Sequence, residues 1–165
     1  MTISPIVILT ASAAVGCAAA GGLFYAFSTF VMRGLDRTEP TEAITAMRGI
    51  NAEAQANVPF LAFFLGSTLL ALAVGVVAVG RLGRPGGWLL LAGAVVGLLA
   101  FVVTIAFNVP LNNRLDGVDP ATLSATEAEH EWRTYLSAWT GWNHVRTVSG
   151  VAAAALMLTG LAASS

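Results

Sequence analysis

The residues best suited to chemistry lie in one short stretch, Trp139 to Arg146, which holds two of the four tryptophans and the last charge of the chain. Asparagine and arginine donate hydrogen bonds that stabilise an oxyanion, and tryptophan rings offer flat apolar surfaces. On a helix, at about 100° per residue, six side chains share an arc of roughly 100°: Trp132, Tyr135, Trp139, Trp142, Asn143 and Arg146. This face predicts a pocket with aromatic walls and donors for an oxyanion.

The membrane offers an alternative explanation of the same residues. Tryptophans collect at membrane boundaries, and arginine side chains extend from there toward the polar surface. His144 lies about 100° around the helix from Asn143, so these neighbours in sequence point to different surroundings. His144 is the histidine nearest the predicted pocket in sequence, but its helical phase places it off the aromatic face.

A second group of polar residues precedes a proline. Thr104, Asn108 and Asn112 are spaced four apart, so they share one helical face. Pro110 removes one backbone hydrogen bond and displaces the carbonyl of Ala106, which predicts a kink or break. Irregular backbone at membrane depth is tolerated where it lines a cavity, and this makes Asn108 and Asn112 candidate binding residues. The alternative is that Pro110 simply ends the helix at the membrane boundary.

Metal, hydrolytic and nucleotide chemistry receive less support. Glu127 and His130 have the i, i+3 spacing of di-iron helix bundles, but such bundles need a second pair and further carboxylates. Neither histidine belongs to a recognisable nucleophile elbow, and no glycine-rich phosphate loop is present. The formal net charge of −1 and the scattered arginines argue against nucleic acid as a partner. We therefore expect no cofactor and no metal.

The elements that position these residues are membrane helices. The chain is 56% hydrophobic and only 10% charged, whereas about a quarter of residues are charged in soluble domains. Four runs free of charge reach the roughly 18 to 20 residues that a spanning helix needs. A cleaved signal peptide is the alternative for the first run, which lacks a positive leading segment. We predict an all-α integral membrane four-helix bundle, a single domain over 1–165, with spans at 6–32, 58–80, 88–109 and 145–163.

Two longer polar segments connect these spans. Between Arg33 and Asn57, apolar residues recur at helical spacing and predict an amphipathic helix. Asn51 lies on its apolar stripe, either as an internally bonded amide or as a donor to a ligand. Ser124 and Glu127 form a capping box, from which a helix could run about 58 Å to Ala163 at 1.5 Å per residue.

The arginine distribution and the small residues give weaker expectations. Six of the eight arginines fall in the two long polar segments, which predicts that these face the cytoplasm and that the chain lies in the inner (plasma) membrane of the cell. Small residues four apart along the first helix predict close packing with another helix, either of the same chain or in a homo-oligomer. The lipid bilayer is the expected surrounding of the chain.

Three strings carry a resemblance to a known family: AMRGIN from Ala46, FNVPLNNRL from Phe107, and WRTYLSAWTGWNHVRT from Trp132. Together with the four spans they resemble the anthrone oxygenase family, small membrane proteins long described as a domain of unknown function. The resemblance covers nearly the whole chain, and the Asn-x-Pro-x-Asn and Trp-Asn-x-x-Arg strings are its most specific parts. Some members are associated with oxidation of polyketide anthrones to anthraquinones.

The resemblance implies a small, hydrophobic, aromatic substrate, and oxidation by O₂ without a bound cofactor. Such a reaction needs a base and donors that stabilise the resulting anion. Arg146, Asn143 and Asn112 are the predicted donors, and Trp139 and Trp142 are predicted to stack on the substrate, with Asn51 and Asn108 as further binding residues. His144 is the predicted base. The rival prediction is a non-catalytic membrane protein that binds or carries a lipophilic molecule, or a subunit of a larger complex.

Overall fold

The computed structural model describes residues 4–164, and helices form nearly all of this part of the chain. It contains four helical runs long and apolar enough to cross a membrane: Pro5–Leu35, Val58–Val79, Gly87–Asp116 and Ala125–Ala163. The predicted all-α class with four spans is thereby confirmed, and the chain is an integral membrane protein. The elements are α1 (Pro5–Ala26), η1 (Phe27–Val31), α2 (Met32–Leu35), α3 (Pro40–Ala56), α4 (Val58–Val79), α5 (Gly87–Val103), η2 (Thr104–Asn108), α6 (Val109–Asp116), η3 (Pro120–Thr122) and α7 (Ala125–Ala163).

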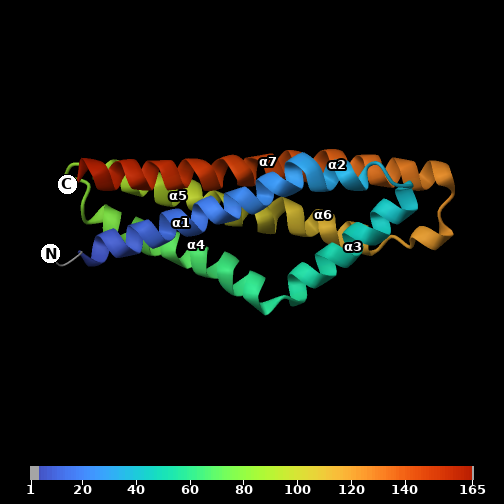
Figure 1. Cartoon of the computed structure of the whole chain (residues 1–165), viewed down its shortest axis with the longest axis horizontal. Coiled ribbons are helices and arrows are strands. Elements are labelled where there is room, and N and C mark those ends of the chain that lie inside the picture. Colours follow the sequence, from blue (N-terminus) through green and yellow to red (C-terminus); the bar gives the residue numbers. More distant parts are fainter. Residues whose placement is uncertain (1–3, 165) are drawn as a thin grey trace.

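Helix α7 runs the whole length of the molecule, and the other helices pack along it (Figure 1). Helices α1, α4 and α5 accompany its C-terminal half, whereas α2, α3 and α6 surround its N-terminal half. Helices α3 and α4 meet at Asn57 and form a V that points away from α7. The inside of this V faces the bundle.

The two halves of the molecule pack by different means. In the C-terminal half of α7, small residues bring the helices close: a Cβ added to Gly150 would lie 2.6 Å from the carbonyl oxygen of Cys17 on α1. Alanines such as Ala13 and Ala153 are fully buried in that core. In the other half, large side chains such as Trp132 and Met47 fill the space between α3 and α7. Dispersion contacts and shape therefore hold the spanning half together, since lipid is as apolar as the core.

Two side-chain caps fix where the polar segments end. The Asn57 side chain accepts a hydrogen bond from the Phe60 backbone at 2.9 Å and begins α4. Ser124 and Glu127 form the predicted capping box at the start of α7. The amphipathic helix predicted before Asn57 is α3, which buries Met47 and Asn51.

A π-helical turn takes the place of the break expected at Pro110. In η2 the Val109 N–H donates to the carbonyl of Thr104, five residues back. The wider turn lets the chain stay helical through Pro110 to Asp116. A second π-helical turn, η1, lies at the end of α1. Such turns often occur at functional sites, and both contribute residues to the cavity described next.

Candidate functional site

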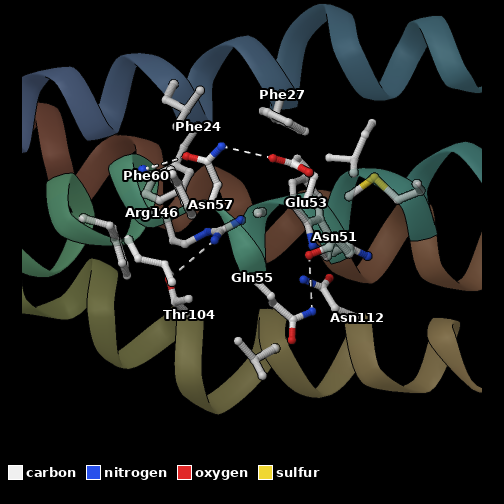
Figure 2. Close-up of a pocket in the computed structure, with 18 of the residues that line it drawn as sticks. Phe24, Phe27, Asn51, Glu53, Gln55, Asn57, Phe60, Thr104, Asn112 and Arg146 are labelled. Carbon is white, nitrogen blue, oxygen red and sulfur yellow. Dashed lines mark hydrogen bonds between the residues drawn. The ribbon is translucent and has the colours of Figure 1, made fainter.

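A cavity of about 800 Å³ lies inside the V of α3 and α4, against α1, α5, η2 and α7 (Figure 2). Pockets for small organic molecules have volumes of about 300 to 1,000 Å³ and mostly apolar walls. This cavity has that character because six aromatic side chains line it: Phe24, Phe27, Phe60, Phe64, Phe101 and Trp139. A flat apolar molecule fits such walls.

Arg146 brings a buried positive charge to this apolar cavity. Only 5% of the residue is exposed, and its guanidinium carbon lies 4.1 Å from the centroid of the Phe24 ring and 5.1 Å from that of Trp139. Its Nη1 lies 3.4 Å from the Thr104 hydroxyl. Within residues 4–164 no carboxylate forms an ion pair with it. Neutral acceptors and ring faces alone balance the charge, which is costly for a buried cation.

Two buried donors at the cavity have no partner among the described protein groups. They are Nε of Arg146 and the indole Nε1 of Trp139, each on a residue that lines the cavity. A buried donor without an acceptor costs about 1 to 3 kcal/mol. Both groups donate and neither can accept. Neither atom has exposed surface in this structure, so the Arg146 guanidinium as a whole, and not this pair of atoms, brings to the cavity a positive charge that favours an anionic group.

Asn143 lies outside the cavity lining and fixes the position of Arg146 by a hydrogen bond. The Asn143 amide donates to the Phe24 carbonyl at 2.6 Å and to the Ser28 hydroxyl at 2.7 Å, both at the end of α1. Its side-chain oxygen accepts a hydrogen bond from Nη2 of Arg146. Asn143 is fully buried and does not line the cavity. It acts on the cavity through the position of Arg146.

A second polar group lies toward the other end of the cavity. The Tyr135 hydroxyl donates to the Asn112 side-chain oxygen at 2.9 Å, and the Asn51 amide lies 3.5 Å from the same hydroxyl. Figure 2 shows Arg146 with Thr104 at one end and Asn51 with Asn112 at the other. Thr104 and Asn112 are eight positions apart, so the two polar groups lie about 12 Å apart along the helix axis at 1.5 Å per residue.

The rim of the cavity carries one carboxylate. Glu53, near the end of α3, accepts a hydrogen bond from the Asn57 amide at 3.1 Å. Both residues line the cavity, and Glu53 is exposed. The adjacent Gln55 donates to the Asn51 carbonyl at 3.3 Å. The mouth of the cavity is thus polar, while its interior is aromatic.

The structure brings four of the predicted site residues to this cavity: Asn51, Asn112, Trp139 and Arg146. The other four lie outside its lining, and of these Asn143 has been described above. Asn108 is buried and donates to the Trp139 carbonyl at 3.3 Å. Trp142 stacks on Phe107, with ring centroids 3.6 Å apart. His144 is exposed and lines a separate groove of about 370 Å³ between η1, α2 and α7.

Several residues of the cavity were not singled out from the sequence. Phe24 and the phenylalanines of α4 have one sequence signal that points to the cavity. Aromatic residues gather at the ends of two predicted spans, and these ends are expected on the same side of the membrane. Glu53 carried none, because the amphipathic pattern of α3 assigns it to the polar side. Tyr135 was placed on the aromatic face, but its hydrogen bonds to Asn51 and Asn112 depend on three helices meeting.

The acidic side chains near His130 are bonded to partners other than a metal ion. Glu127 accepts the hydrogen bonds of the Ser124 capping box, and Glu131 forms an ion pair with Arg114 at 3.0 Å. His130 itself is exposed. Among residues 4–164, no three histidine, cysteine or acidic side chains come together as a metal site.

Residues 47–156 match the model of the anthrone oxygenase family. No curated protein and no solved structure matches the chain. The matched residues include both polar ends of the cavity, on α3, α5–α6 and α7. Helix α1, which supplies Phe24, and η1, which supplies Phe27, precede the match.

Proposed function

The chain belongs to the anthrone oxygenase family, and from this premise we propose that it oxidises a planar phenolic substrate of the anthrone type with O₂. The reaction converts a methylene group into a carbonyl, with one oxygen atom of O₂ entering the product and the other leaving as water. The buried guanidinium of Arg146, which lines an aromatic cavity and pairs with no carboxylate among the described residues, is the observation that carries the proposal.

The substrate must first become electron-rich enough to react with O₂. An anthrone loses a proton from its methylene carbon, and the negative charge then spreads to the oxygen across the central ring. The positive charge of Arg146 attracts that oxygen, so the cavity stabilises the anion more than the neutral substrate. Donors directed at developing charge in a water-poor site are typically worth about 100- to 1,000-fold in rate each.

The anion then reacts without a bound cofactor. One electron passes to O₂, and the resulting radical pair combines at the former methylene carbon as a peroxide anion, which takes up the proton first removed and becomes a hydroperoxide. Loss of the second proton from that carbon expels the outer oxygen as hydroxide, which takes up a proton to form water, and leaves the carbonyl. Overall, one methylene and one O₂ give one carbonyl and one water, so atoms and electrons balance.

The second polar group orients the substrate along the cavity. Asn51 and Asn112 offer amide hydrogen-bonding groups to phenolic oxygens at the end remote from Arg146. The aromatic walls, Trp139 among them, contact the ring faces. Holding the substrate in one orientation keeps its acidic carbon at a fixed place, which contributes to rate by lowering the entropy lost in reaction.

Oxygen uptake tests this proposal directly. Purified, chelator-treated protein in lipid discs is given an anthrone, and O₂ consumption and quinone absorbance are followed against protein-free discs. We expect quinone formation above the spontaneous rate and a loss of about 100-fold or more in folded Arg146→Gln protein. A spontaneous rate with wild-type protein would contradict the proposal. Tight binding of the anthrone without oxidation would favour the carrier function, and activity that metal restores after chelation would contradict the cofactor-free reaction.

We also propose that the two polar segments lie in the cytoplasm, with the chain in the plasma membrane. Six arginines belong to these segments and two to the turn between α4 and α5, and basic residues concentrate on the cytoplasmic side. Single cysteines placed at Arg84 and at Glu42, in a Cys17→Ala background, would show the sidedness by labelling with an impermeant thiol reagent in intact cells. Labelling at Glu42 alone would contradict it.

A further inference from the structure

The reaction also needs a base that accepts the substrate proton, and the hydrogen-bond donors described above cannot act as one. Of the residues that line the cavity, only Glu53 and Arg146 carry ionisable side chains. Arginine remains protonated and cannot act as a base. We propose that Glu53 is the catalytic base that removes the proton from the substrate methylene, an inference that rests on the proposed oxidation.

The side chain of Glu53 is held in a defined place. One carboxylate oxygen, Oε1, accepts from the Asn57 amide at 3.1 Å. The amide oxygen of Asn57 caps α4 by accepting from Phe60, so the cap also fixes the amide that bonds Glu53. Among the described residues, Oε2 of Glu53 has no hydrogen-bond donor. One oxygen of the base is therefore anchored, and the other is available to take a proton.

Glu53 on α3 and Arg146 on α7 reach the same cavity from different helices. Both line it, and the carboxylate and the guanidinium do not form an ion pair. Figure 2 shows Glu53 bonded to Asn57 and Arg146 bonded to Thr104. In an anthrone the acidic methylene lies across the central ring from the oxygen that takes the charge. A base and a cation that reach one cavity from different helices, and do not pair with each other, suit that arrangement.

The other titratable groups near the cavity are less suitable. His144 is exposed in the separate groove formed with α2. The Tyr135 hydroxyl is already bonded to Asn112 and Asn51, and it does not line the cavity. Glu53, by contrast, touches both the cavity and the solvent, so the proton that it takes can pass to water.

The chemical step is a proton transfer. The substrate C–H bond breaks, an O–H bond forms at Oε2 of Glu53, and the electron pair of the broken bond becomes the delocalised anion. O₂ takes no part in this step. The same carboxyl group can later return its proton to the peroxide anion and regenerate the carboxylate.

Deuterium exchange without oxygen isolates this step. An anthrone is held anaerobically with protein in D₂O-based lipid discs, and the loss of methylene proton signal is followed by NMR. We expect wild-type protein to speed exchange above the protein-free rate, and Glu53→Gln to lower the catalysed rate by about 100-fold or more. Glu42→Gln on the same helix is the matched control, because Glu42 is exposed and outside the cavity lining. It should exchange and oxidise as wild type.

The two hypotheses fail in different ways. Binding of the anthrone, followed by quenching of tryptophan fluorescence, shows that each variant is folded and loaded. Wild-type protein that neither exchanges nor oxidises would contradict the proposed function itself. Wild-type oxidation together with unchanged exchange and oxidation in Glu53→Gln would overturn only the assignment of Glu53. Recovery of exchange in Glu53→Ala on adding formate, a small carboxylate that can enter at the rim, would support it.

Discussion

The side-chain oxygen of Asn143 accepts a hydrogen bond from the Arg146 guanidinium, one turn further along α7. The amide nitrogen of the same Asn143 is bonded to the Phe24 carbonyl and the Ser28 hydroxyl at the end of α1. The buried Asn143 side chain thus links Arg146, which lines the cavity, to the contact between α1 and α7. The position of the positive charge in the cavity therefore depends on how α1 and α7 pack.

Replacing Asn143 by alanine should therefore affect both stability and activity. The change leaves Arg146 without its anchor and removes the side-chain donor to the Phe24 carbonyl and the Ser28 hydroxyl. An unsatisfied buried polar group costs about 1 to 3 kcal/mol, so the melting temperature in detergent should fall, and quinone formation by the folded fraction should fall as well. Circular dichroism and oxygen uptake measure the two effects. Full activity in folded protein would contradict the anchoring role.

Replacing Tyr135 by phenylalanine should change substrate binding more than turnover. The hydroxyl donates to Asn112 and lies beside the Asn51 amide, so its loss frees both asparagines at the end remote from Arg146. We expect a higher KM with kcat nearly unchanged, and a loss of about 0.5 to 1.5 kcal/mol in stability. Steady-state oxygen uptake separates the two constants. A fall in kcat alone would place Tyr135 in the chemistry instead.

The architecture could be predicted because its signals are local. Charge-free runs gave the four spans, and Ser124 with Glu127 gave the start of a helix that reaches Ala163. The cap at Asn57 follows from one residue type before a proline-containing first turn. Each of these depends on a few neighbouring residues, and tertiary contacts did not override them.

The cavity could be predicted only in part, because it depends on how helices meet. The helical phase correctly separates His144 from Arg146, which the structure places on different faces of α7. The phase alone does not show that Phe107 covers Trp142. The pattern of α3 predicts a solvated Glu53, and the residue is indeed exposed, but it also lines the cavity that forms between α3 and α4. The cavity exists because α3 packs on α7 through residues far apart in the sequence, such as Met47 and Trp132.

Two glycines of α7 should respond oppositely to alanine. A Cβ at Gly150 would lie 2.6 Å from the Cys17 carbonyl and 2.8 Å from the Cα of Gly21, both backbone atoms of α1. Gly150→Ala should therefore force α1 away and lower the melting temperature. A Cβ at Gly141 meets nothing within 4 Å, so Gly141→Ala should stabilise the helix by about 1 kcal/mol. Thermal unfolding of the pair in the same detergent tests this, and equal shifts would contradict the close approach of α1 and α7.

Replacing His144 by alanine distinguishes the base predicted from the sequence from the base inferred from the cavity. His144 is exposed and lines the groove with Arg33 and Asp36, on a different face of α7 from Arg146. A base must come within hydrogen-bond reach of the proton that it removes, and a side chain in that groove does not face a substrate held beside Arg146. We expect His144→Ala to keep wild-type kcat and wild-type deuterium exchange, whereas Glu53→Gln loses both. A loss of about 100-fold or more in His144→Ala that still binds the anthrone would reverse the assignment and move the reaction to the groove.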